Sequence, residues 1–482
     1  MVFQSFVFCL AFLPALLALY LLVRTSRTAS TIVLIVGSGI FYAWKTIWWL
    51  VPLVVVATVD YFVGMKMAVL DDDRIRRRWL LVSLVVNLAM LSAFKYLGWL
   101  TLTTNELLGA FGIAASIPVI ATTLPPGISF YTFETMSYTI DVYRRDFKAE
   151  PSYLVYLNFV LFFPHLVAGP ILRPRDLIGQ LKVVRPVATA EEVRLALCQI
   201  AWGLFKKVVF ADNFGDVVSY AVRALTTPPV ETGGVGLLYA LGFTFQIYCD
   251  FSAYSDIARG SALLFGIKLP RNFLTPLFAK SPQEFWQRWH ITLSTWIRDY
   301  VYIPLGGRSG SPLRQWITML GTMGLAGLWH GAGVMFICWG LFHGFLVMTY
   351  RQRPIQSLLS RASAGAPAVA AWAVFFLINM FGWLMFRAGS GHDGEFLKMF
   401  DTLGEIPAAF SQHTFLWGLR QLTFLAAPLL LVDWTAYRRN TEVPEVLASL
   451  NLAALSTALT AMWFIGVIFA KRSGYDFIYF AF

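Results

Sequence analysis

Apolar stretches long enough to cross a bilayer recur along the whole chain, and short clusters of charged residues separate them. Hydrophobic residues make up 57% of the 482 residues and charged residues only 13%, whereas soluble domains carry roughly 25% charged residues. A membrane-spanning helix needs about 20 apolar residues, and about 10 to 12 segments of the chain meet this need. The sequence therefore predicts an all-α, polytopic transmembrane protein, with re-entrant and interfacial helices between the spans.

The net charge of +11 does not indicate a nucleic-acid partner, because apolar aromatic-rich runs separate the basic residues. These residues gather in short loops, as expected for the cytoplasmic side of a membrane protein. Two such clusters, Arg24/Arg27 and Arg74–Arg78, are two predicted spans apart, which places both on the cytoplasmic side and the N-terminus outside. The first apolar run lacks a basic start and a cleavage site, so we expect a retained span.

Motifs for several common site types are missing from the sequence. The four cysteines are far apart in apolar segments, and neither CxxC nor HExxH occurs, so we predict no bound metal. The chain also lacks a GxSxG elbow, a phosphate-binding loop and a dinucleotide fingerprint. The sequence therefore does not indicate a serine hydrolase, an ATPase or a nicotinamide enzyme, and we expect no bound cofactor.

Two apolar segments are interrupted by glycine and proline. LPPGISFYTFETMSYTIDVYRR contains Glu134 and begins with a helix-breaking Pro-Pro-Gly. FFPHLVAGP contains His165, which either packs in the core or lines a cavity. Irregular backbone within a membrane must be buried in protein or face water, so the first segment is predicted to be re-entrant or to line a cavity.

The middle of the chain adds further polar side chains to apolar segments. Thr189 and Glu192 form a capping pattern that predicts a helix from about Ala190, and we expect Lys206–Lys207 near its end to lie at the membrane interface. Asp250 and Asp256 are six residues apart and share no helix face well. They are predicted to line a polar cavity or to border the interface.

Two histidines, each preceded by a tryptophan, mark the most unusual stretch of the chain. His330 follows Trp329 in the uncharged run 316–345, where an ionisable group favours a function over simple packing. The glycines after His330 suit the close approach of a substrate. His290 follows Trp289 in a more polar segment, where cationic neighbours would keep its imidazole neutral and able to accept a proton. His343 is expected to pack locally.

Basic and aromatic residues around these histidines are candidates for binding a donor molecule. Arg288, Arg298, Arg308 and Arg314 form a basic rim that either grips phosphates or is ordinary cytoplasmic positive charge. Trp289 and Trp329 are candidates for lining the same site. The chain ends FIYFAF, residues 477–482, an aromatic pattern that alone indicates an interfacial anchor.

The stretch EFWQRWHITLSTWIRDYVYIPLGG, together with GLWHGAG and WGLFHG, resembles the membrane-bound O-acyltransferase family. The similarity is strongest to the bacterial branch that contains the alginate O-acetylation and teichoic acid D-alanylation membrane proteins. It extends to FFPHLVAGPILRPRDL, FKKVVFAD and FQIYCDFSAYSDIARGSALLFGIKLPRNF, and covers about residues 1–350 and the terminal FIYFAF. Pro126 and the terminal FAF depart from common family patterns, but neither touches the histidines.

The resemblance implies a single domain over residues 1–482, with N-terminal spans (1–123), a catalytic core (124–350) and C-terminal spans with the aromatic tail (351–482). It implies a ring of helices around a central tunnel, His330 as the active-site histidine and His290 as the second signature position. The expected activity moves an acetyl or other acyl group from a cytoplasmic thioester, such as acetyl-CoA or an acyl carrier, across the bacterial inner membrane. The expected acceptor is an extracytoplasmic polysaccharide, with a periplasmic hydrolase-like acetyltransferase as partner.

The resemblance also gives Tyr479 a candidate role, because the D-alanylation system has a companion peptide with a similar tail whose tyrosine looks like an acyl carrier. Two alternatives to polysaccharide acetylation stay open. One is D-alanyl or peptidoglycan acyl transfer within the same family. The other is a proton-coupled transporter or flippase for an envelope precursor, with His330, His165 and the Asp250/Asp256 pair as a proton relay.

Overall fold

The computed structural model describes the chain except for residues 114–115, 121–122, 184–187, 227–233, 308, 363, 393, 399–412, 472–476 and 478–482. Every regular element among the described residues is a helix, and no β-strand occurs in this part of the chain. The predicted all-α class is therefore confirmed.

Five helical stretches in the described part of the chain are long and apolar enough to cross a membrane. They are Ile47–Ala68, Asp73–Lys95, Gly365–His392, Phe415–Arg439 and Leu452–Phe469. A sixth is possible if Val334–Tyr350 and Arg353–Arg361, bent by 75°, form one broken span. The number is below the predicted 10 to 12 because several apolar helices, such as Arg27–Tyr42, are shorter than a full crossing.

The chain forms two compact units, which are described separately. The N-terminal unit comprises Met1–Ala196 and Ala258–Pro270, and the C-terminal unit comprises Leu197–Ile257 and Arg271–Phe482. Two helices contribute residues to both units: α10 (Ala190–Phe205) and α12 (Val235–Leu264). Whether the chain is one domain with boundaries near residues 123 and 350 stays a prediction.

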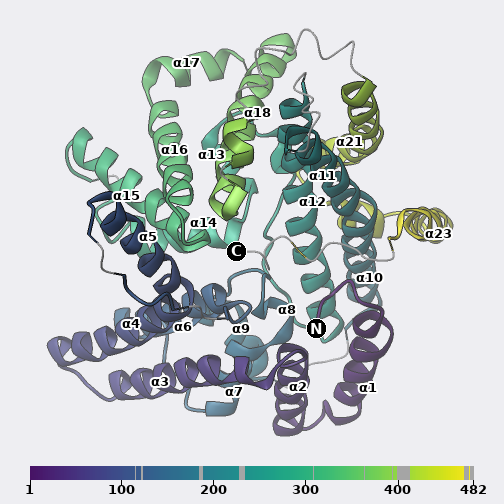
Figure 1. Cartoon of the computed structure of the whole chain (residues 1–482). Coiled ribbons are helices and arrows are strands. Elements are labelled where there is room, and N and C mark those ends of the chain that lie inside the picture. Colours follow the sequence, from purple (N-terminus) through teal and green to yellow (C-terminus); the bar gives the residue numbers. More distant parts are fainter. Residues whose placement is uncertain are drawn as a thin grey trace. The chain divides into compact units, whose positions relative to one another are not determined.

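The other elements of the N-terminal unit are mostly short or medium-length helices (Figure 1). They are η1 (Val7–Phe12), α1 (Leu13–Val23), α2 (Arg27–Tyr42), η2 (Ile47–Trp49), α3 (Leu50–Ala68), α4 (Asp73–Lys95), α5 (Leu97–Ala110), α6 (Ile128–Arg144), α7 (Tyr153–Leu161), α8 (Phe163–Leu166) and α9 (Pro174–Leu181). A buried polar network joins α3, α4 and α6: Asn87 donates to Asp60 at 2.7 Å and accepts from Thr135 at 2.8 Å.

The predicted helix break before α6 is present. Gly127 adopts a left-handed conformation (φ 76°) and α6 begins at Ile128. A Cβ at Gly127 would lie 2.2 Å from the carbonyl oxygen of Leu166, so glycine is needed both for the turn and for the close approach of the α8 backbone. The start of α10 was also predicted correctly: Thr189 and Glu192 accept hydrogen bonds from each other's backbone N–H groups, and α10 begins at Ala190.

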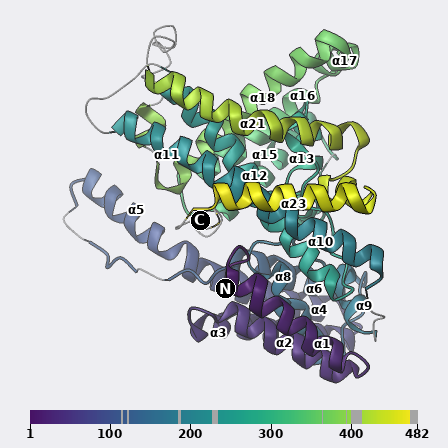
Figure 2. The ribbon, with the colours of Figure 1, turned by 90° about the vertical axis from the view of Figure 1, so that its right-hand side faces the viewer.

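The C-terminal unit contains the two-histidine stretch and the last predicted spans. Its elements are η3 (Lys206–Ala211), α11 (Asp212–Thr226), η4 (Pro276–Phe278), α13 (Pro282–Arg288), α14 (Ile291–Ile297), η5 (Arg298–Tyr302), α15 (Pro312–His330), α16 (Val334–Tyr350), α17 (Arg353–Arg361), α18 (Gly365–Arg387), η6 (Ala388–His392), α21 (His413–Arg439), α22 (Val443–Ala448) and α23 (Leu452–Phe469). Figure 2 shows α21 and α23 as long helices that run across the view one below the other.

The apolar run around His330 folds into a tight helical hairpin, α15 and α16, rather than one long helix (Figure 1). Two glycines let the helices touch. A Cβ at Gly327 would lie 2.0 Å from the Phe336 carbonyl oxygen, and a Cβ at Gly340 would lie 2.0 Å from the Met323 carbonyl oxygen. The hairpin therefore packs backbone against backbone, which fixes where α15 ends and where His330 lies.

Replacing either contact glycine with alanine should push the hairpin apart. Overpacking of this kind costs about 1–3 kcal/mol, so we expect Gly327→Ala and Gly340→Ala to lower the thermal stability of the detergent-purified protein. Gly321→Ala, on the same helix, is the matched control because a Cβ at Gly321 would have no neighbour within 4 Å. Since alanine favours a helix by about 1 kcal/mol over glycine, the control should be at least as stable as wild type. Equal melting temperatures for Gly327→Ala and Gly321→Ala would contradict the packing described here.

Candidate active site

His330 is the last residue of α15, at the turn of the glycine-packed hairpin. Its side chain is buried, and three aromatic rings surround it. The ring centre of His330 lies 4.8 Å from that of Trp329, 5.0 Å from that of Trp339 and 5.1 Å from that of Phe386, all edge-on. The predicted buried imidazole in an apolar setting is therefore present, on the rigid end of a helix.

The two glycines that follow His330 lie close to other parts of the C-terminal unit. A Cβ at Gly331 would lie 2.0 Å from the Phe336 ring, and a Cβ at Gly333 would lie 3.1 Å from the Gly389 carbonyl oxygen. Gly331 makes room for the Phe336 side chain, and the approach of a substrate at these glycines stays a prediction. Phe336 in turn contacts Phe386, with ring centres 5.1 Å apart, and so closes one side of the aromatic surroundings of His330.

His290 lies between α13 and α14 in a left-handed backbone conformation (φ 42°, ψ 53°), which is rare for a non-glycine residue. The imidazole is fully buried. Its Nδ1 is 3.1 Å from Oδ1 of Asn272, and the Phe251 ring centre lies 4.8 Å away. Residues held in such strained conformations often belong to functional sites.

One indole joins the two histidines. The ring centre of Trp329 lies 4.8 Å from that of His330 and 6.2 Å from that of His290, edge-on to both. All three residues belong to the C-terminal unit. The structure thus brings together His290 and His330, 40 positions apart in the sequence, around the Trp329 side chain.

The predicted cause of the neutral state of His290 was wrong, although the predicted state agrees with the structure. Burial lowers the pKa of the His290 imidazole from its ordinary value to about 3. The neighbouring cation Arg288 is instead engaged elsewhere: its guanidinium donates to Glu284 at 3.0 Å and to the Leu274 carbonyl at 3.1 Å, and stacks on Tyr437.

The other members of the predicted basic rim do not share one partner. Arg298 pairs with its neighbour Asp299 at 2.6 Å and is largely exposed. The Arg314 side chain lies against Gly306 and Gly310, and Arg308 lies outside the described residues. A phosphate-gripping cluster of these arginines stays a prediction. Trp289 is buried against Trp383, with ring centres 4.5 Å apart, and helps to build the aromatic core next to His290.

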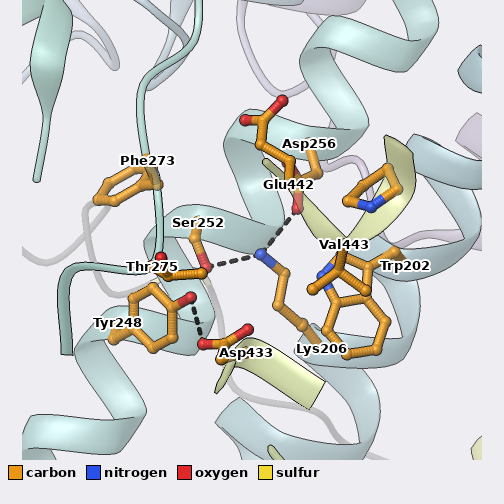
Figure 3. A pocket seen from close by; sticks show the side chains of 11 residues that line it. Trp202, Lys206, Tyr248, Ser252, Asp256, Phe273, Thr275, Asp433, Glu442 and Val443 are labelled. Carbon is orange, nitrogen blue, oxygen red and sulfur yellow. Dashed lines mark hydrogen bonds and ion pairs between the residues drawn. The ribbon is translucent and has the colours of Figure 1, made fainter. Parts of the chain in front are cut away.

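The lysine pair of η3 is buried within the protein, and its predicted position at the membrane interface stays a prediction. Lys206 and Lys207 are 3% and 1% exposed. Lys206 bonds Asp256 and Ser252, both at 2.7 Å (Figure 3). Lys207 bonds Asp250 at 2.6 Å. A charge is buried at acceptable cost only when it is paired, which is why the two aspartates of α12 and the two lysines lie together.

A small cavity borders the Lys206–Asp256 pair. Its volume of about 20 Å³ is enough for about one water molecule. Figure 3 shows the Lys206 ammonium between Ser252 and Asp256, and the Tyr248 hydroxyl donating to Asp433 at 2.6 Å. Asp256 therefore lines a polar cavity, which was one of the two predicted positions for the aspartates. Asp250 instead forms an ion pair with Lys207.

His165 lies in the N-terminal unit, whereas His290 and His330 lie in the C-terminal unit. Its Nδ1 is 2.8 Å from Glu134 Oε1, and its Nε2 is 3.0 Å from the Phe159 carbonyl oxygen. Both side chains are fully buried, and the backbone N–H of Leu172 also bonds Glu134, at 3.1 Å. Of the two predicted roles of His165, packing in the core and lining a cavity, these contacts fit packing. His165 thereby stabilises the irregular segment after α7.

The remaining histidine of the hairpin packs among aromatic rings, as expected. His343 on α16 lies with ring centres 4.9 Å from Trp339 and 5.2 Å from Trp286. Tyr479 lies outside the described residues. Phe477, two positions earlier, is buried against Tyr254, and the Lys207 ammonium lies 4.7 Å from its ring centre.

Sequence reasoning missed Asn272, the hydrogen-bond partner of His290. The residue lies 18 positions before His290, in the PRNF segment that links α12 to η4. A lone asparagine in a loop carries no sequence signal, although PRNF lies inside the stretch that resembles the family. The partners of Lys206 and Lys207 were also missed, because the sequence does not show that Asp256 and Asp250 of α12 face them.

The sequence matches a known family of membrane enzymes. The model of the MBOAT, membrane-bound O-acyltransferase family, matches residues 34–388, which is most of the chain. The chain belongs to the membrane-bound O-acyltransferase family. It is accordingly a multi-pass membrane acyltransferase, and the matched range includes both His290 and His330.

Three relatives represent different branches of the family. A Pseudomonas aeruginosa protein named "Probable alginate O-acetylase AlgI" is 39% identical over 80% of this chain and 72% of its own length. The peptidoglycan O-acetyltransferase of Helicobacter pylori is 31% identical over 80% of this chain and 77% of its own. The teichoic acid D-alanyltransferase of Bacillus subtilis is 28% identical over 46% of this chain and 58% of its own.

The buried lysine cluster of this acyltransferase gives a stability prediction. Removing one partner of a buried ion pair costs about 3–5 kcal/mol, because the other charge is left unpaired. We therefore expect Lys206→Met to lower the melting temperature of the purified protein strongly, and Lys206→Met/Asp256→Asn to recover part of the loss.

Lys268→Met is the matched control, because Lys268 pairs with Glu192 at 2.8 Å but is 69% exposed. Surface pairs contribute about 0–1 kcal/mol, so this variant should melt close to wild type. Equal losses of stability in Lys206→Met and Lys268→Met would show that burial does not set the strength of these pairs.

Proposed function

We propose that this protein transfers an acetyl group from a cytoplasmic acyl thioester across the inner membrane for the O-acetylation of an extracytoplasmic polysaccharide, with His330 as general base. The observation that carries the proposal is the placement of His330 and His290 around Trp329, in buried aromatic surroundings. Two ionisable side chains in such a setting are costly to keep and favour a catalytic role.

The chemistry of a thioester fits these surroundings. A thioester is already activated, so the enzyme must supply a base for the attacking hydroxyl, hydrogen bonds to the developing oxyanion and protection from water. His330 supplies the base, and the rings of Trp329, Trp339 and Phe386 exclude water from it. His290, neutral through burial, supplies a second hydrogen-bonding nitrogen beside the same indole.

The choice of acetyl and of a polysaccharide follows from the relatives. Several proteins named "Probable alginate O-acetylase AlgI" are 36–39% identical to this chain over 80% or more of its length, and the acetyl-transferring relative from Helicobacter is named for peptidoglycan. We propose an alginate-like exopolysaccharide as acceptor and acetyl-CoA or an acyl carrier as donor. No resident cofactor is needed, because the activated group arrives with its donor.

The location and the partner are part of the same proposal. A donor in the cytoplasm and an acceptor outside require a path through the bilayer, which a ring of helices around a central tunnel would provide. We place the protein in the bacterial inner membrane, where a periplasmic hydrolase-like acetyltransferase would complete transfer to the polysaccharide. Trp289, Arg288 and Arg298 are the proposed donor-binding or tunnel-lining residues on the His290 side.

The alternatives are less well supported. D-alanyl transfer is the named activity of relatives at 28–30% identity that cover less than half of this chain. A proton-coupled transporter would need Asp250, Asp256 and His165 as a relay, yet the three are bonded to Lys207, Lys206 and Glu134 respectively. Peptidoglycan acetylation differs from the main proposal only in its acceptor.

Removal of the proposed base should abolish acetylation without loss of the protein. A general base contributes about 10²–10⁴-fold to the rate. We therefore expect the rate of acetyl transfer by purified His330→Ala to be at least about 10²-fold below that of wild type. His343→Ala is the control, because it deletes a buried imidazole of the same hairpin that packs against Trp286 and Trp339. Its rate per folded molecule should stay close to wild type. A His330→Ala rate above about a tenth of wild type would show that His330 is not the base.

Tyr479 is the proposed acyl relay of the tail. In this step the acyl carbon leaves the thioester sulfur, which takes up a proton, and bonds to the phenol oxygen; the acceptor hydroxyl then displaces the phenol, which recovers its proton. Splitting the transfer into two covalent steps would let an external partner take the group. Phe477, two residues earlier, is buried against Tyr254, which supports a tail that begins in contact with the protein.

Tyr479→Phe keeps the ring and removes only the oxygen that would carry the acyl group. We expect polysaccharide acetylation in cells to collapse while the membrane level of the protein stays normal. Phe480→Leu, which alters an adjacent aromatic side chain but no hydroxyl, should acetylate far better than Tyr479→Phe. Near-normal acetylation by Tyr479→Phe would return the tail to the role of an interfacial anchor.

A further inference from the structure

We infer that Asn272 is a positioning residue that holds His290 as the Nδ1–H tautomer and turns its Nε2 lone pair toward the reaction. This inference rests on the proposed acyl transfer for its purpose, but its geometry stands by itself. Asn272 is fully buried in the segment between α12 and η4.

Three polar atoms converge on one oxygen of the Asn272 side chain. Oδ1 lies 3.1 Å from Nδ1 of His290, 3.0 Å from the Thr292 hydroxyl and 3.4 Å from the Thr292 backbone nitrogen. On its other side, the amide Nδ2 donates to the Ser255 hydroxyl of α12 at 3.1 Å. The side chain is therefore bonded at both ends.

The backbone N–H of Thr292 decides which way the amide points. A backbone nitrogen can only donate, so the atom that faces it must be the acceptor oxygen of Asn272. That oxygen cannot donate to the imidazole, and His290 Nδ1 must therefore carry the proton. In a neutral imidazole the other nitrogen, Nε2, is then an acceptor.

Backbone hydrogen bonds of the segment around Asn272 also hold the left-handed turn at His290. The Asn272 carbonyl accepts from the Ile291 N–H at 2.9 Å, and the Leu274 N–H donates to the Arg288 carbonyl at 2.9 Å. These bonds tie the two sides of the left-handed turn at His290 to the segment that contains Asn272. The strained backbone, the ring orientation and the tautomer are thus fixed by one residue and its neighbours.

The charged groups on the elements around His290 are compensated by partners. On α12, Asp250 and Asp256 pair with Lys207 and Lys206. On the linking segment and α13, Arg271 bonds Glu445 and Arg288 bonds Glu284. The imidazole itself contacts the rings of Phe251, Phe273 and Trp329.

His290 is consequently held as a neutral hydrogen-bond acceptor. Such a group suits the orientation of an attacking hydroxyl, whose proton it accepts in a hydrogen bond. The role of base then falls to His330, which contacts the same Trp329 indole. Residues that orient a functional imidazole through its second nitrogen typically contribute about 10- to 100-fold to activity in metal sites, and we expect a loss of this size without Asn272.

The tautomer can be measured without any activity assay. Full-length protein labelled with ¹⁵N-histidine and held in nanodiscs gives one pair of ring nitrogen signals per histidine, and the signals absent from His290→Ala identify His290. We expect a protonated Nδ1 and an unprotonated Nε2 in the wild-type protein at neutral pH. A protonated Nε2 with a bare Nδ1, or an imidazolium, would overturn the inference, whether or not acyl transfer occurs.

Two variants connect the tautomer to catalysis. Asn272→Leu removes the acceptor and should scramble the His290 tautomer and lower kcat by about 10- to 100-fold. Asn272→Asp keeps an oxygen in the same place and should retain the Nδ1–H signal, while its carboxylate raises the pKa of His290 and adds an acid limb to the pH–rate profile. Should Asn272→Leu fail to fold, Asn272→Asp still decides, because an unchanged pH profile or a lost Nδ1–H signal contradicts the inference.

Asn87→Leu is the matched control for the loss of a buried amide. Asn87 makes hydrogen bonds to Asp60, Thr135 and the Ser83 carbonyl in the N-terminal unit. It should cost stability but leave the ¹⁵N signals of His290 unchanged. If the wild-type protein shows the predicted His290 tautomer but transfers no acyl group, the proposed function fails and the positioning role survives.

Discussion

Several polar side chains inside this apolar chain have a partner that compensates for their burial. An unpaired charge or a bare hydrogen-bonding group in such surroundings costs several kcal/mol. Three pairs of this kind are Lys206 with Asp256, His165 with Glu134, and His290 with Asn272. The chain is organised around these buried pairs as much as around its apolar helices.

The pairs differ in what they leave available for chemistry. The lysines of η3 are each bonded to a carboxylate, and His165 has partners on both ring nitrogens. These groups therefore stabilise the fold. His290 and His330 instead meet at the Trp329 indole, and His330 stands at the end of a helix fixed by glycine contacts with its neighbour. Precise placement of a base by a rigid element is what general base catalysis requires.

Local signals in the sequence predicted local structure well. The Thr189/Glu192 cap and the helix break at Gly127 lie where the patterns placed them. Long-range pairing was not predictable from composition. The burial of Lys206 and Lys207 depends on aspartates more than 40 residues away, and the turn of His290 depends on Asn272. The two histidines were identified as site residues because His330 lies in an uncharged apolar run and because each histidine follows a tryptophan in the stretch that resembles the family.

We propose that this membrane protein consumes an acyl thioester by means of His330. The most direct measurement follows free thiol release from ¹⁴C-acetyl-CoA by the purified protein in nanodiscs, with an oligosaccharide acceptor present. We expect thiol release that exceeds that of empty nanodiscs, transfer of the label to the acceptor, and loss of both in His330→Ala. Thiol release that is equal in wild type and His330→Ala, or a wild-type protein that moves an envelope precursor and leaves the thioester intact, would contradict the claim.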